Sequence, residues 1–124
     1  MNEKIKGLLI CPESRTITEI ELRVDGDRNL LYAMYENIGC ETVDVVRGVL
    51  SHLPSSPDDD IWLDDEGAIN GTKVCFRIKD ELQWFFGRGL ILGCDMTKGE
   101  CKSHTLTEED IKCLKEQIQW GLRG

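Results

Sequence analysis

The N-terminal part of the chain has the hydrophobic pattern of a β-hairpin. Residues 4–11 contain an apolar run without alternation, which is typical of a strand that is buried on both faces. In residues 17–24, Ile20, Leu22 and Val24 alternate with charged residues, and this pattern predicts a strand with one buried face. A turn that begins with a proline separates the two stretches, so we expect the strands to pair.

Apolar residues at helical spacing come next along the chain. Leu30, Met34 and Ile38 recur every four residues and predict a helix of about ten residues. Asp27 is placed to cap the N-terminus of this helix, and Gly39 is placed to end it.

A second helix is predicted to begin after Thr107. The threonine is a suitable N-cap, and the three acidic residues that follow it match the positive end of the helix dipole. Its apolar stripe continues at helical spacing toward the end of the chain, at Ile111, Leu114, Ile118 and Leu122. We therefore expect this helix to reach about residue 122.

The rest of the chain predicts further short strands. Apolar and β-branched residues mark them at 42–46, 61–63, 72–78, 90–95 and 101–105. A turn is predicted after residue 63 in which Gly67 has a positive φ, and Asn70–Gly71 is typical of a tight hairpin turn. Strands in runs rather than in strict alternation with helices predict one α+β domain over residues 1–124. We expect a mostly antiparallel or mixed sheet of about six short strands with two packed helices.

Composition narrows the class of protein. The chain has 124 residues, of which 40% are hydrophobic and 31% charged, and this balance is typical of a globular domain. Its apolar stretches fall far short of the roughly 20 residues that span a bilayer, and the N-terminus lacks the apolar core of a signal peptide. We therefore expect a cytoplasmic protein with no membrane partner. The net charge of −8 argues against direct binding of nucleic acid, which requires clustered Lys and Arg.

The six cysteines are expected to be free thiols. No pair has the Cys-x-x-Cys spacing of a zinc ribbon or a redox motif, and we expect a reducing compartment. Cys94, Cys101 and His104 could supply three zinc ligands, with His52 as a distant fourth, but the paired spacing of a zinc knuckle is missing. We therefore expect no metal and no cofactor. No nucleophile-elbow sequence is present either, and the sequence indicates no catalytic residue.

An acidic segment carries most of the net charge. Six carboxylates fall within nine residues: Asp58, Asp59, Asp60, Asp64, Asp65 and Glu66. The simplest interpretation is a solvated loop. The alternatives are a surface for a basic partner, or a site for a divalent cation or for acid–base chemistry, although the EF-hand spacing is absent.

Trp84, Phe85 and Phe86 are three consecutive aromatic residues. Neighbours in a strand face opposite ways, so at least one of them is expected to be exposed. An exposed aromatic patch could contact a ligand or a partner. The alternative is that the three rings bridge two layers of a small core.

Three segments together resemble a known family. They are residues 31–46, residues 61–67 and residues 87–95, the last followed by Gly99. Their order is similar to that in domain-of-unknown-function family 3846, which occurs in bacteriophages, plasmids and bacterial genomes. The resemblance covers roughly residues 5–104 and leaves the C-terminal helix as an addition. It implies an accessory protein of a mobile element and supplies no activity and no catalytic residue.

These observations lead us to expect a non-enzymatic, acidic accessory protein that covers or sequesters a basic host component. Carboxylates would steer the association, and aromatic side chains would anchor it. The candidate partner-binding residues are Asp58, Asp59, Asp60, Trp62, Asp64, Asp65, Glu66, Trp84 and Phe86. The alternative is a binder of a small molecule or nucleotide, or an enzyme, with a pocket lined by residues 84–86 and by polar groups of residues 64–66.

Overall fold

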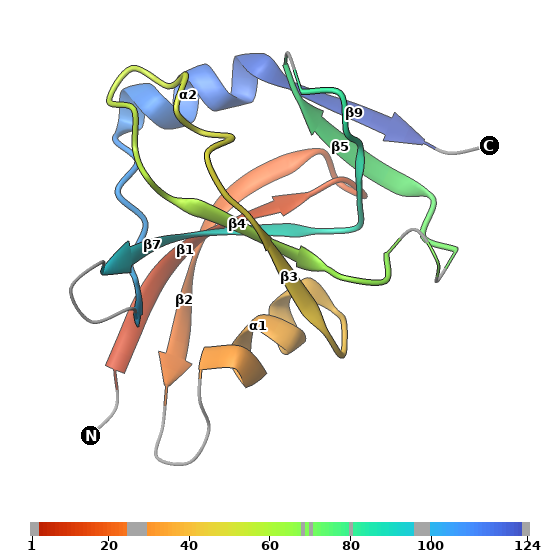
Figure 1. Cartoon of the computed structure of the whole chain (residues 1–124), viewed down its shortest axis with the longest axis horizontal. Coiled ribbons are helices and arrows are strands. Elements are labelled where there is room, and N and C mark those ends of the chain that lie inside the picture. The colour runs from red at the N-terminus through yellow and green to blue at the C-terminus, as the bar shows by residue number, and fades with distance from the viewer. Residues whose placement is uncertain are drawn as a thin grey trace.

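Two antiparallel β-sheets form the framework of the protein (Figure 1). The computed structural model describes residues 3–24, 30–67, 69, 71–79, 81–95 and 100–122. Within these ranges the larger sheet has the strand order β2–β1–β7–β4–β3, with β8 paired to β7, and the smaller sheet has the order β6–β5–β9.

The strands of the larger sheet are β1 (Glu3–Cys11), β2 (Thr16–Val24), β3 (Val43–Val46), β4 (Asp60–Asp64), β7 (Gly89–Asp95) and β8 (Glu100–Lys102). Those of the smaller sheet are β5 (Val74–Ile78), β6 (Phe85–Phe86) and β9 (Ile118–Leu122). The helices are α1 (Leu30–Ile38) and α2 (Glu108–Gln117). The described strand pairs are all antiparallel, so the predicted α+β class is confirmed.

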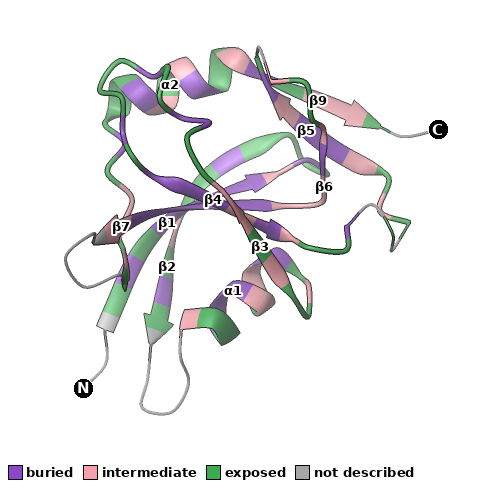
Figure 2. Cartoon of the chain, viewed as in Figure 1, coloured by how far each residue is buried: buried purple, intermediate pink, exposed green. Residues whose placement is uncertain are grey.

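The larger sheet is covered on both faces, and buried residues run along its central strands (Figure 2). On one face, Leu8 and Ile10 pack in a core with the smaller sheet and α2. On the other face, Leu9 and Leu90 pack in a core with Met34 of α1. The prediction that the first strand is buried on both sides is therefore confirmed, and so is its hairpin with β2.

Helix α1 ends where its sequence predicts. Ala33, Met34 and Ile38 are its buried residues, and Gly39 follows with a φ of 79°. A residue with positive φ after the last turn is the usual way for a helix to end, and glycine adopts it at no steric cost. The predicted cap at Asp27 lies outside the described residues.

The prediction of one long C-terminal helix is wrong in its second half. Thr107 caps α2 as expected, but the helix ends at Gln117 and Ile118 begins a strand. Strand β9 pairs with β5, with Ile118 opposite Ile78 and Trp120 opposite Phe76. Pairing with β5 provides hydrogen-bond partners for the backbone of this segment. Ile118 fits this arrangement too, because a strand can bury alternate residues.

Two predictions about the turns after β4 are also wrong. The Asn70–Gly71 turn does not join a hairpin, because β4 and β5 belong to different sheets, and Asn70 lies outside the described residues. Gly71 does have a positive φ, of 78°, and here it helps the chain pass between sheets. Gly67 lacks the expected positive φ. Glycine is needed at this position for a steric reason, since a Cβ here would clash with the carbonyl oxygen of Phe86.

Candidate functional site

Strand β4 divides the acidic segment into two groups. Asp58, Asp59 and Asp60 lie before it and at its start, whereas Asp64 is its last residue and two further carboxylates follow in the turn. A rise of about 3.3 Å per residue separates the two ends of β4 by roughly 13 Å. The six carboxylates therefore do not form one continuous surface.

The first group is directed largely into the protein. Asp59 is 2% exposed and accepts two hydrogen bonds from Thr105, one from the backbone N–H and one from the hydroxyl, each 2.6 Å long. Asp60 is 7% exposed and lies 3.7 Å from Nε of Arg47. Asp58 is exposed. Asp59 is therefore a structural residue and Asp60 is buried beside Arg47, so of these three candidates Asp58 alone faces solvent.

The surroundings of Asp60 make its carboxyl group harder to ionise than that of an exposed aspartate. Burial raises the pKa of Asp60, and the carboxylates of Asp59 and Asp58 raise it further, while the Arg47 guanidinium opposes them. The net pKa lies above the ordinary value for an aspartate.

The second group shares a cavity of about 130 Å³ with aromatic side chains. Asp64 and Asp65 line it from the end of β4, and Trp84 and Phe86 line it from the segment around β6. Asp44 of β3 contributes a third carboxylate. The other lining residues are Val46, Leu63, Gly67, Gln83 and Phe85. No described lysine or arginine lines this acidic pocket, so its charge is negative.

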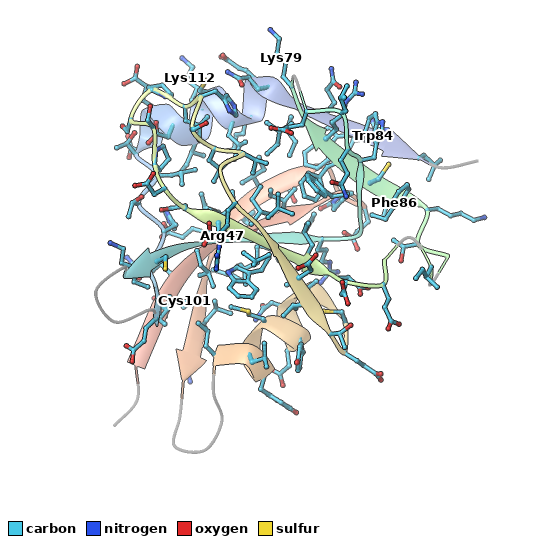
Figure 3. All side chains as sticks on the ribbon, in the orientation of Figure 1. Arg47, Lys79, Trp84, Phe86, Cys101 and Lys112 are labelled. Carbon is cyan, nitrogen blue, oxygen red and sulfur yellow. The ribbon has the colours of Figure 1, made fainter. Side chains whose placement is uncertain are left out.

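Alternation along β6 directs the aromatic residues to the two faces of the smaller sheet. The ring of Phe85 is buried and tilted against that of Phe76, with centroids 5.4 Å apart. Trp84 and Phe86 are half-buried, and both line the acidic pocket (Figure 3). The expectation that the three neighbours cannot all face one core is confirmed, but none of the three rings is fully exposed, as at least one was expected to be.

The indole of Trp84 is held in place from two directions. The guanidinium carbon of Arg77 lies 4.6 Å from the ring centroid, which is a cation–π distance. Arg77 is itself fixed by donating two hydrogen bonds to Oε1 of Gln119. On β9, a Cβ at Gly121 would lie 2.8 Å from the indole, so a glycine allows the ring to pack there.

Asp64 lies where three cavities meet. Besides the acidic pocket, a cavity of about 380 Å³ is lined by Asp64, Glu41 and Glu66, among others. A third, of about 260 Å³, is lined by Asp64 and by Arg88, which pairs with Glu13 at 3.1 Å. The exposed Glu66 therefore lies beside the acidic pocket rather than in it.

Cys40 borders the 380 Å³ cavity, and its raised pKa keeps nearly all of the thiol protonated at neutral pH. Burial raises the pKa of Cys40 to about 11, and the negative charge of Asp64 contributes. A hydrogen bond from the backbone of Thr42 opposes both effects only in part. Because the thiolate is the reactive form, this cysteine suits a structural role better than a catalytic one.

Trp62 is separate from the other aromatic candidates. It is half-buried and packs with the core on the α1 side of the larger sheet. Leu63, its neighbour in β4, faces the acidic pocket on the opposite side. The structure therefore brings together Asp64, Asp65, Trp84 and Phe86, and leaves Trp62 elsewhere.

The cysteines are free in the structure. Cys94 and Cys101 lie opposite each other in the β7–β8 pair, while Nε2 of His104 lies 2.8 Å from a carboxylate oxygen of Glu19. His52 is exposed in the turn before β4. Across the described ranges, no group of three or more His, Cys, Asp or Glu side chains is arranged to hold a metal ion.

Sequence reasoning missed two polar lining residues, Asp44 and Gln83. Asp44 carries a signal in retrospect, because it is the polar residue between Val43 and Val45 in a short strand. Gln83 carries no local signal, and only its position before Trp84 brings it to the pocket.

The fold and this pocket define a small α+β domain with an acidic cavity beside two half-exposed aromatic side chains. The chain belongs to the family described as Domain of unknown function (DUF3846), whose model matches residues 5–119. The match includes α2 and the start of β9, so the expectation that the C-terminal helix is an addition to the family is wrong. No curated protein and no solved structure matches the chain. None of the described helices is long and apolar enough to cross a membrane.

Proposed function

We propose that this protein is a non-enzymatic binding protein that takes a basic side chain of a partner protein into the acidic pocket. One observation carries the proposal: Asp44, Asp64 and Asp65 converge with Trp84 and Phe86 on a cavity that no described lysine or arginine lines. A Lys or Arg side chain of a partner would supply the missing positive charge. Its apolar stem would contact the aromatic rings.

The size of the acidic pocket favours a side chain over a whole small molecule. Pockets for drug-sized ligands hold roughly 300–1,000 Å³, whereas this one has about 130 Å³. The contact between Arg77 and Trp84 also supports the proposal, because the same aromatic cluster already holds one guanidinium group. Exposed carboxylates would steer the partner, and Trp84 and Phe86 would serve as its anchors.

The partner we propose is a basic host protein that this chain covers or sequesters in the cytoplasm, as an accessory protein of a phage or other mobile element. The resemblance described above and the acidic net charge support this assignment. A protein with a net charge of −8 can compete for a basic surface, including one that otherwise holds nucleic acid.

A second candidate function is the binding of a small cationic molecule. The cavities of about 380 and 260 Å³ that also reach Asp64 would provide the space that the acidic pocket lacks. Glu41 and Glu66 would then add their charge to that of Asp64.

A pull-down from bacterial lysate at low and high salt tests the proposal. A basic protein should be retained at low salt and released at high salt, because screening weakens exposed charge pairs. The double variant Asp64→Asn/Asp65→Asn should bind at least about tenfold more slowly. Asp58→Asn is the matched control, since it removes an exposed charge at the other end of β4 and should leave binding unchanged.

Two outcomes contradict the proposal. Equal losses per removed charge, so that Asp58→Asn has about half the effect of the double variant, would show that net charge acts rather than the pocket. A metabolite that co-purifies in place of a protein, identified by mass spectrometry of the extract, would favour the second candidate.

A further inference from the structure

A cavity of about 410 Å³ lies between the edge strand of the larger sheet and the C-terminal segment. Thr16, Ile17 and Thr18 line it from β2, and the rest of the lining comes from Arg15, Lys115, Ile118 and Trp120. It shares no lining residue with the three cavities around Asp64. Its volume falls within the range of ligand pockets, roughly 300–1,000 Å³.

The charge of this cavity is opposite to that of the protein. Arg15 and Lys115 line it, and no aspartate or glutamate of the described ranges does, although the chain has a net charge of −8. The ion pairs of the described residues join other groups, and no carboxylate among these residues lies within ion-pair distance of Arg15 or Lys115. Two unpaired cations at one cavity are an arrangement that attracts an anion.

The uncharged part of the lining is mixed. Ile17 and Ile118 are nearly buried and Trp120 is half-buried, so they give the cavity an apolar wall with one large flat ring. Thr16 and Thr18 also line the cavity, as polar residues of the edge strand β2. An apolar wall with a few polar groups and a local charge is the usual composition of a small-molecule site.

The backbone at Arg15 is a separate observation. Its φ of 55° lies in the left-handed region, which side chains larger than glycine rarely adopt. Ser14 and Thr16 flank it, and their hydroxyl oxygens lie 2.8 Å apart in a hydrogen bond. Arg15 is the last residue of the β1–β2 turn, where hairpins often place a left-handed residue, so the turn holds one of the two cations at the cavity.

We propose that this cavity binds a small organic anion with a flat ring. Arg15 and Lys115 pair with its phosphate or carboxylate group, and Trp120 and Ile118 contact the ring. The site does not depend on the acidic pocket, since the two have no residue in common.

Calorimetric titration of the full chain with paired probes tests the proposal. Adenosine monophosphate carries both an anion and a ring, whereas adenosine supplies only the ring and inorganic phosphate only the anion. Adenosine monophosphate should bind at least about tenfold more tightly than either part. Benzoate against benzamide makes the same comparison for a carboxylate and separates the two kinds of anion.

Variants then assign the binding to the cavity. Arg15→Gln and Lys115→Gln should each weaken binding of the preferred anion about five- to tenfold. Lys112→Gln is the matched control, because Lys112 is an exposed lysine of the same helix outside the lining (Figure 3). NMR shift changes should cluster at residues 15–18 and 115–120. The Asp64→Asn/Asp65→Asn variant should bind the anion like the wild type, which keeps this test distinct from that of the proposed function.

Three outcomes overturn the proposal. In the first, charged and neutral probes bind equally. In the second, Lys112→Gln weakens binding as much as Lys115→Gln does. In the third, no anionic probe binds while circular dichroism shows the protein to be folded.

Discussion

Thr105 donates both its backbone N–H and its hydroxyl to the carboxylate of Asp59, with donor–acceptor distances of 2.6 Å. The two residues are 46 positions apart in the chain. Their pairing ties the start of β4 to the segment that leads into α2, beside the end of the β7–β8 pair. There a Cβ at Gly93 would lie only 2.5 Å from the carbonyl oxygen of Ser103. One carboxylate of the acidic segment therefore fastens the two halves of the chain together.

The Asp59→Asn variant should lower the free energy of unfolding by about 1–2 kcal/mol, because its amide nitrogen cannot accept a hydrogen bond and one of the two part-buried, charge-assisted bonds from Thr105 is lost. Asp58→Asn should stay within about 0.5 kcal/mol of the wild type, since Asp58 is exposed. Urea denaturation measures both variants. If both variants were as stable as the wild type, Asp59 would be as solvated as Asp58, as the composition of the segment first suggests.

Asp110 should make stability depend on pH in the acid range. It is fully buried, and its carboxylate accepts the backbone N–H groups of Thr107 and Ser55 at 2.9 Å. Burial alone would raise the pKa of Asp110, but these hydrogen bonds outweigh it and the net pKa lies below the ordinary value of 3.8. The stabilisation is therefore complete above the unfolded-state pKa and is lost as the pH falls through the folded-state pKa.

Asp110→Asn should accordingly be less stable than the wild type at pH 7, and the difference should shrink between about pH 5 and pH 2. Thermal unfolding followed by circular dichroism across this range measures the difference. Glu109→Gln, an exposed carboxylate in the same helical turn, serves as the control and should show little change. A difference that stays constant with pH would assign the effect of Asp110 to packing rather than to its charge.

Local pattern predicts the strands and the first helix well, because each of them buries one regular set of side chains. The β1–β2 hairpin and α1 depend on contacts that the periodicity of their own residues already indicates. The end of the chain differs, since Ile118 fits both a helical stripe and an alternating strand. Its conformation is decided by β5, which lies about forty residues earlier and offers a strand edge for pairing.

The candidate site could be predicted only in part for the same reason. Asp64, Asp65, Trp84 and Phe86 stand out by residue type, but their shared cavity requires the end of β4 to lie against β6 of the other sheet. The burial of Asp59 depends equally on a partner far along the chain, Thr105. Composition indicates which side chains can bind, whereas long-range packing determines which of them face the same space.

Substitution by asparagine should distinguish a glycine that is needed for its backbone conformation, Gly71, from one that is needed for lack of space, Gly67. Gly71 has a positive φ and no atom near its Cβ position, and asparagine tolerates that conformation, so Gly71→Asn should be nearly neutral. Gly67→Asn should lower the free energy of unfolding by about 1–3 kcal/mol, because its side chain would collide with the backbone of Phe86. NMR shifts of Phe86 should change in this variant alone. If both variants are equally stable, β4 and β6 do not approach as closely as the structure shows.

Cys40 should react slowly with iodoacetamide in the folded protein. A pKa of about 11 leaves on the order of one thiolate in a thousand at pH 8, about a hundredfold less than at the ordinary value of 9.0. Peptide mass spectrometry after timed alkylation measures the rate at each cysteine, with the protein in urea as the reference. Asp64→Asn should accelerate the reaction several-fold, because it removes a negative charge that raises the pKa. Equal alkylation rates at Cys40 with and without urea would show that the folded protein does not raise the pKa of this thiol.

A pair of alanine variants should show whether the chain ends as a helix or as a strand. In a helix running to residue 122, Ile118 and Leu122 would share the buried stripe and both truncations would be costly. In the structure Ile118 is 8% exposed and packs in the core between the sheets, whereas Leu122 is 71% exposed at the end of β9. Ile118→Ala should therefore lower the free energy of unfolding by about 2–4 kcal/mol, and Leu122→Ala by less than about 0.5 kcal/mol. Comparable losses in urea denaturation would favour the continuous helix, and the pairing of β9 with β5 would then have to be abandoned.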